Sequence, residues 1–121
     1  MKIALLFIAF TCMADLCHAE QSLTATDPAS VCHNEVVLLE IWRAQGLIYS
    51  IEYKGSNAQL VVHQRQWLRS RADVQADVAL AAYCRVAAEY GRGDVEVTGL
   101  NGTSVFGTVI DGRWRNRLTG N

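Results

Sequence analysis

The sequence predicts an α+β domain, a two-layer αββαββ arrangement in which two helices pack on one face of an antiparallel sheet. Three observations predict it. Two segments, 27–45 and 70–91, repeat apolar residues at the helical period of about 3.6 residues. Each is followed by two short alternating segments joined by a turn, as in a β-hairpin. Half of the residues are hydrophobic and only one is proline, a composition typical of a folded chain.

The chain begins with the pattern of a secretory signal peptide. Lys2 precedes an apolar run, Ile3–Phe10, that is far shorter than the roughly 20 residues of a membrane-spanning helix, and small residues follow it. Cleavage is predicted after Ala19; cleavage after Ala14 and an uncleaved N-terminal anchor are the alternatives. We therefore expect a cleaved signal peptide (1–19), a flexible leader (20–26), a single α+β domain (27–121), no membrane span after cleavage, and a location in the periplasm or outside the cell.

Two cysteines, Cys32 and Cys84, remain after signal cleavage, and in an oxidising compartment we expect them to form a disulfide bond. They are too far apart for a CxxC motif, and two thiols alone do not make a zinc site, so no bound metal is expected. Each lies at the margin of its helix's apolar stripe, where two helices lying side by side would touch. The bond would close a loop of about fifty residues and contribute up to about 4 kcal/mol. Two buried free thiols are the alternative.

The two helices have recognisable ends. The first begins at Asp27–Pro28, because aspartate caps a helix and proline is tolerated at its first position, and it ends at Gly46. Its predicted apolar stripe is Val31, Leu38, Ile41 and Trp42, flanked by Leu39. In the second helix, Ser70 is the expected cap, Asp73 favours the helix dipole, and Gly91 ends the helix. Its predicted buried stripe is Ala72, Ala76, Ala79, Leu80, Tyr83, Val86, Ala87 and Tyr90.

The first hairpin lies between the helices. Segment 47–54 alternates as a half-buried strand, with one predicted inner face made by Leu47, Tyr49, Ile51 and Tyr53. A turn at 54–57 leads into a second strand, 58–64, in which Leu60 and Val62 point inward. A polar link follows, and its Trp67 is expected to anchor the chain by packing just before the second helix.

The second hairpin follows the second helix. Val95 and Val97 point one way along its first strand, while Glu96 and Thr98 point the other. Asn101–Gly102 is a strong turn signal, because both residues tolerate positive φ. The return strand is 103–110, with Gly99 and Gly107 as bulges or points of close packing. A further turn at Asp111–Gly112 leads to 113–117, which is predicted to form a short edge strand.

No catalytic signature is present in the sequence. It has no GxSxG, HExxH, Walker or dinucleotide-binding motif. His33 and His63 fit ordinary surface or boundary histidines, and Asp73 and Asp77 fit a solvated helix face. We therefore lean against an enzyme and expect no cofactor. The formal net charge of −1 gives no general drive towards nucleic acid, so sequence-specific nucleic-acid binding is not expected.

Two sets of residues are candidate contact surfaces. The first is a strip on the side of the second helix that is predicted to face away from the core: Val74, Val78, Ala81 and Arg85. It would suit a dimer or partner contact; singly tolerated surface residues are the alternative. In the second set, alternation places Arg113, Arg115 and Arg117 on one face of the last strand and Trp114 on the other. Such arginines bind anionic groups, or they protect a strand edge from pairing with another chain.

These observations favour a small exported binding or accessory protein of the bacterial envelope. It would act through contacts with a protein partner or with an anionic envelope component, and an oligomer is compatible with the second-helix strip. One alternative is a small-molecule-binding domain or an enzyme whose site is assembled only in three dimensions. The other is a structural component of an envelope or secretion assembly.

Overall fold

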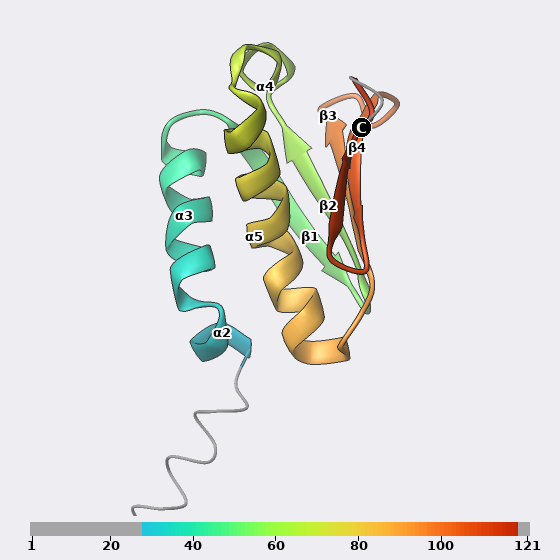
Figure 1. Cartoon of the computed structure of the whole chain (residues 1–121). Helices are drawn as coiled ribbons and strands as arrows, with labels where there is room; N and C mark the ends of the chain where they lie inside the picture. Colours follow the sequence, from blue (N-terminus) through green and yellow to red (C-terminus); the bar gives the residue numbers. More distant parts are fainter. Residues whose placement is uncertain (1–27, 119–121) are drawn as a thin grey trace, which may run out of the picture.

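The computed structural model describes residues 28–118 of the chain (Figure 1). The predicted signal peptide, the leader and the Asp27 cap lie outside the described residues. The helices are α2 Pro28–Val31, α3 His33–Ala44, α4 Gln64–Arg69 and α5 Ala72–Tyr90. The strands are β1 Ile48–Lys54, β2 Asn57–Val62, β3 Asp94–Gly99, β4 Val105–Ile110 and β5 Arg113–Asn116.

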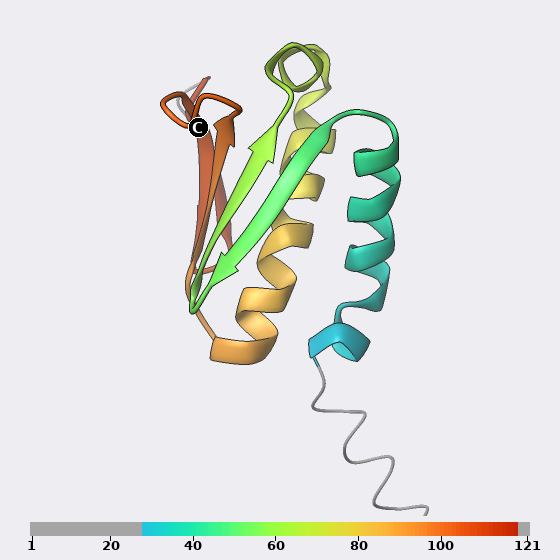
Figure 2. The same ribbon diagram turned by 180° about the vertical axis from the view of Figure 1, so that it is seen from behind.

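The molecule has two layers, which confirms the predicted α+β class. The five strands form one sheet in the order β1-β2-β3-β4-β5, and α3 and α5 lie side by side against one of its faces (Figure 1). Seen from behind, β1 and β2 lie in front of α5, and no helix of residues 28–118 covers them on this side (Figure 2). One face of the sheet is therefore covered by helices, and we call the other the open face.

The sheet is mixed, so the prediction of a wholly antiparallel sheet is wrong at one pair. Strands β2 and β3 are parallel, with Leu60 opposite Val97, while the other three pairs are antiparallel. Parallel neighbours need a long crossover connection, and the segment from α4 through α5 provides it by crossing the covered face. The two hairpins thus join along their inner strands.

Helix α5 is rotated relative to the predicted stripe. Ala79, Tyr83 and Val86 are buried as predicted, but Leu80 is 38% exposed and Tyr90 is exposed as well. The buried residues of α5 are Gln75, Val78, Ala79, Ala81, Ala82, Tyr83 and Val86. This wide face results because α5 packs on the sheet and on α3 at once.

Of the two predicted ends of α5, the N-terminal one is wrong and the C-terminal one is confirmed. Arg71, not Ser70, occupies the N-cap of α5, and the Ser70 hydroxyl instead donates a hydrogen bond to the Gln66 carbonyl of α4, 2.8 Å away. At the other end, Gly91 adopts the left-handed conformation, with a φ of 81°, and ends the helix as predicted. The polar link before α5 forms the short helix α4, and its Trp67 is fully buried, which confirms the predicted anchor.

The first helix is divided at Cys32 into α2 and α3, and its stripe was predicted only in part. Leu39 is buried, and Leu38 and Trp42 pack against the core, but Val31 and Ile41 are largely exposed. In β1 the alternation is interrupted by a bulge between Ile48 and Ser50. As a result Ile48 is buried and Tyr49 is 54% exposed, the reverse of the prediction, while Ile51 and Tyr53 still pack against the core.

The remaining strands follow the predicted alternation, but their bounds differ from the predicted 58–64, 103–110 and 113–117. Strand β2 ends at Val62, because Gln64 already begins α4. Strand β4 starts only at Val105, and β5 ends at Asn116. Leu60 and Val62 of β2 and Val95 and Val97 of β3 are fully buried on the covered face. Gly107 is a point of close packing, because a Cβ atom there would lie 2.1 Å from the Trp114 ring. That ring also meets Trp67 edge-on at 6.3 Å between centroids, so β5 is held against the core by an aromatic pair.

Candidate binding site on the open face of the sheet

The open face carries ordered rows of polar side chains, which alternate along each strand with the buried residues of the covered face. Strand pairing aligns them across the sheet. One row is Glu52, Gln59, Glu96, Thr108 and Arg115. The next row is Lys54, Asn57, Asp94, Ile110 and Arg113.

Opposite charges flank the neutral strand β4. The acidic residues Asp94 and Glu96 lie on β3, and Arg113 and Arg115 lie on β5. All four side chains are exposed. Two strand spacings separate the acids from the arginines, roughly 10 Å. Among residues 28–118, no ion pair within 4.0 Å involves any of these four side chains.

The open face has two hollows, one on each side of β4. The first has a volume of about 320 Å³ and includes the acidic residues Glu52, Asp94 and Glu96 in its lining. The second has a volume of about 670 Å³ and is lined by Thr108, Ile110, Arg113, Trp114, Arg115 and Arg117. Thr108 and Ile110 line both hollows, and Ile110 is 56% exposed. The face therefore carries a mainly acidic hollow, to which Lys54 also contributes, and an arginine hollow, and the two share a strip of β4.

The last strand has the predicted alternation. Arg113, Arg115 and Arg117 are exposed, whereas Trp114 is half-buried and packs against the core. Asn116 also points inward, where it is buried and donates a hydrogen bond to the Gln75 side-chain oxygen at 3.1 Å. Strand β5 lies at the edge of the sheet, as predicted. The arginines remain candidate binding residues.

The predicted strip on α5 is not a free surface. Val78 is 0% exposed, Ala81 is buried, and Val74 packs against the core. The prediction that the strip faces away from the core is wrong, because this side of α5 lies between the sheet and α3. Arg85 alone is exposed, and its guanidinium carbon lies 4.9 Å from the centroid of the Tyr53 ring.

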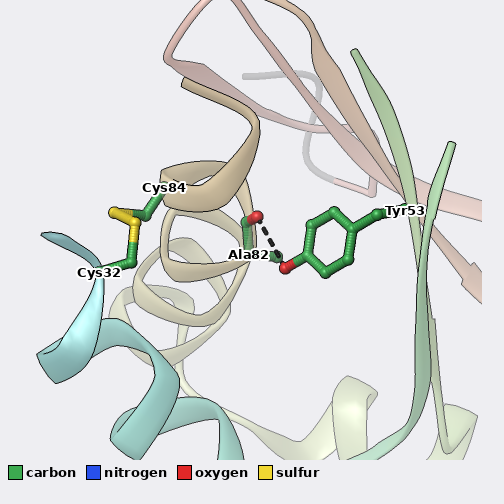
Figure 3. Close-up of a disulfide and its surroundings, with 4 residues drawn as sticks. All are labelled: Cys32, Tyr53, Ala82 and Cys84. Carbon is green, nitrogen blue, oxygen red and sulfur yellow. Dashed lines mark hydrogen bonds between the residues drawn. A yellow bond between two sulfur atoms is a disulfide. The ribbon is translucent and has the colours of Figure 1, made fainter. Parts of the chain in front are cut away.

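The predicted disulfide is present. Cys32, between α2 and α3, is bonded to Cys84 of α5, with their Cα atoms 5.9 Å apart (Figure 3). A carboxylate oxygen of Glu35 lies within 4.8 Å of the two sulfur atoms. This trio is not a metal site, because a metal ligand would have to be a thiolate and both sulfur atoms are committed to the disulfide.

A small groove runs beside the disulfide, between α3, α5 and β1. Its volume is about 230 Å³, and Cys32, Leu39, Arg43, Tyr53 and Arg85 contribute to its lining. The Tyr53 hydroxyl donates a hydrogen bond to the Ala82 carbonyl of α5 at 3.1 Å (Figure 3). Burial raises the pKa of Tyr53, and the nearby charge of Arg85 acts in the opposite direction. Tyr53 therefore stays protonated near neutral pH and links β1 to α5.

The histidines do not form an acid–base pair in the described part of the chain. His33 is exposed, and His63 meets the Tyr49 ring edge-on at 5.6 Å between centroids. Within residues 28–118 no hydrogen bond joins a histidine to a carboxylate.

Asp94 and Glu96 are the site residues that the sequence analysis did not single out. The signal for them was present, since Glu96 was predicted to point away from the buried Val95 and Val97. Their relation to the arginines depends on the pairing of β3, β4 and β5, which aligns acid and arginine in the same rows.

Comparison with protein-family models, with curated proteins and with solved structures finds no match for this chain. Across residues 28–118, no helix combines the length and the apolar character needed to cross a membrane.

Proposed function

We propose that this chain is a small exported binding protein of the bacterial envelope, which acts through the open face of its sheet. The observation that carries the proposal is the arginine hollow, a recess of about 670 Å³ whose lining includes the exposed Arg113, Arg115 and Arg117. The partner is a protein or an envelope component that presents anionic groups to Arg113, Arg115 and Arg117.

The spacing of the arginines suits a partner with repeated anionic groups. Same-side residues of a strand follow one another at about 7 Å, so Arg113 and Arg115 of β5 form two separate cationic positions, and Arg117 lines the same recess just after the strand ends. Each guanidinium has five donors in a planar fork and can bind a carboxylate or phosphate through two parallel hydrogen bonds. Charged side chains can also serve to keep an edge strand from pairing with another chain. That role does not explain why a recess lies beside the arginines, so the recess favours binding.

A location in the periplasm or outside the cell fits two observations. The N-terminal sequence has the pattern of a signal peptide. The Cys32–Cys84 disulfide is compatible with an oxidising compartment, where such bonds persist. Both observations support export. Mass spectrometry of protein produced in the periplasm checks whether Cys32 and Cys84 are oxidised to the disulfide.

The proposal is tested by affinity capture from an envelope fraction. Wild-type protein is compared with Arg113→Glu/Arg115→Glu and with a matched control, Arg65→Glu/Arg69→Glu, which makes the same charge change on exposed positions of α4. Wild type and control are expected to retain the same partners, and the β5 variant is expected to lose them. Capture of the same partners by all three proteins would show that the arginine hollow is not the binding site.

A small-molecule site is the second candidate, and the groove between α3, α5 and β1 favours it. Its lining includes the apolar side chains of Leu39, Ile51 and Ala81. Arg43 and Arg85 contribute cationic groups that suit a small amphipathic anion, although the acidic Glu40 also lines the groove and lies 3.9 Å from Arg43. Its volume of about 230 Å³ is below the roughly 300–1,000 Å³ of most ligand pockets, so it supports this candidate less well than the open face supports a larger partner. Ligand-induced NMR shifts confined to Tyr53 and Arg85 would favour it.

A further inference from the structure

The open face carries opposite charges at equivalent positions on the two sides of strand β4. Strand pairing places Asp94, Ile110 and Arg113 in one row and Glu96, Thr108 and Arg115 in the next. Each row therefore reads acid, neutral residue, arginine from β3 to β5. The acid and the arginine of a row stand at equal distances, about one strand spacing, on either side of β4.

From this pattern of opposite charges we infer that a partner of the open face is a second copy of the same chain. The inference rests on the proposed function, because it names the partner of the same surface. The two copies pack face to face around a two-fold axis that runs parallel to β4 in the plane of the interface. Such an interface uses the same patch on both subunits, as most homodimers do.

The two-fold operation matches each of the four charges on β3 and β5 with its opposite. Rotation about an axis along β4 keeps each residue's position along the strand and exchanges β3 with β5. Asp94 of one copy then faces Arg113 of the other, and Glu96 faces Arg115, so that each pair occurs twice. Ile110 faces its own equivalent at the centre, where its 56% exposed side chain provides an apolar contact.

The alternative in-plane axis, perpendicular to the strands, is disfavoured. It would place β3 of one copy over β3 of the other, so that Asp94 and Glu96 would face carboxylates and Arg113 and Arg115 would face guanidinium groups. Like charges brought together across an interface are strongly repulsive. The charge pattern therefore selects one orientation and supplies both the attraction and its specificity.

The four charges are available for this contact. Within residues 28–118 none of them belongs to an ion pair, since acid and arginine of the same copy are separated by the whole width of β4. Packing two sheets with their strands nearly aligned is also a common arrangement in β-sandwiches. Because the interface is mostly charged, the dimer is expected to be weak and sensitive to salt, which screens exposed ion pairs.

The inference is tested by sedimentation equilibrium of the mature protein, from micromolar to millimolar concentration at low and high salt. Wild type is expected to form a dimer at low salt and to dissociate at least tenfold more readily at about 1 M salt, where the screening length falls to about 3 Å. Glu96→Arg and Arg115→Glu, each alone, are expected to weaken association at least tenfold. An Arg69→Glu control on α4 is expected to behave as wild type.

The decisive arm mixes the two variants. An equimolar mixture of Glu96→Arg and Arg115→Glu restores opposite charges at both contacts and is expected to form a heterodimer, which a misfolded variant could not do. A wild type that stays monomeric at millimolar concentration and low salt, or a mixture that fails to associate, would overturn the inference. If wild type is monomeric but captures envelope partners only when Arg113 and Arg115 are present, the dimer is overturned and the proposed function stands. If wild type dimerises but captures the same partners without these arginines, the proposed envelope partner is overturned and the dimer stands.

Discussion

The two faces of one sheet differ in what their side chains do. On the covered face, Val62, Val95, Val97 and Val109 are fully buried beneath the helices. On the open face, the intervening residues of the same strands include charged side chains such as Glu96, which are exposed. Because side chains alternate along a strand, adjacent residues can serve folding and recognition separately. Substitutions on the covered face should therefore change stability, and those on the open face should change association.

The largest effect is expected for Val78→Asp, on the side of α5 that packs into the core over the covered face. Val78 is 0% exposed between α5 and the sheet, so an aspartate there would bury an unpaired charge. We expect a loss of more than about 4 kcal/mol, enough to abolish cooperative unfolding in urea. The matched control is Val37→Asp on α3, where the valine is 43% exposed and the loss should stay within about 1 kcal/mol. Equal losses in the two variants would contradict the burial of this side of α5.

Val78 also shows what the sequence of α5 could not decide. The presence of the helix, its approximate length and its end at Gly91 were predicted correctly, because they depend on residues close together in the sequence. Its buried face was predicted only in part, because alanine occurs all around the helix and packs equally well in several orientations. The orientation is set by the simultaneous contact with α3 and the sheet, and that contact is made by residues far apart in the sequence.

The next largest effect is expected for removal of the disulfide, which joins the two helices of the covered face. Cys32 and Cys84 are 52 residues apart, and opening a loop of that length should reduce the free energy of unfolding by about 2–4 kcal/mol. Cys32→Ala/Cys84→Ala is compared with wild type by urea unfolding, with and without reductant. Reductant should destabilise wild type only. If the double variant were as stable as wild type, the cross-link would not contribute to holding α2 and α3 in place.

A third effect is expected at the buried polar contact beneath β5. The Gln75 amide donates to the Trp67 carbonyl at 2.7 Å and accepts from Asn116 at 3.1 Å. Gln75→Leu leaves both partners without their hydrogen bond, and we expect a loss of about 1–3 kcal/mol in urea unfolding. Combining it with Asn116→Leu should cost less than the sum of the single substitutions. Strict additivity would indicate that the two side chains do not interact.

For the open face, the sequence predicted which side chains alternate along a strand better than which strands pair with one another. The alternation of Arg113, Trp114 and Arg115 follows from the period of two, which is local. The parallel pairing of β2 with β3 depends on how the crossover through α5 returns the chain, and no local signal specifies it. The rows of acid and arginine likewise emerge only when the registers of three strands are known.

A smaller effect is expected for Tyr53→Phe, at the edge of the covered face. The hydroxyl bonds to the Ala82 carbonyl, so its removal should lower stability by about 1 kcal/mol at neutral pH. Burial raises the pKa of Tyr53 above the unfolded value, so the contribution of the protonated hydroxyl is present below about pH 10 and is lost as pH rises through the folded pKa. Urea unfolding from pH 7 to 11 should show the two proteins converging. A constant difference would contradict the raised pKa.

The smallest effect on stability is expected for Arg113→Thr/Arg115→Thr, on the open face. Both side chains are exposed, neither belongs to an ion pair within residues 28–118, and threonine suits a strand, so unfolding in urea should change by no more than about 0.5 kcal/mol. Association in sedimentation equilibrium should nevertheless fall, because the interface loses its cationic half. A loss of stability comparable to that of Gln75→Leu would show that the arginines help to hold β5 in the sheet. The open face would then be structural as well, and the separation between the two faces would fail at the strand where recognition is proposed.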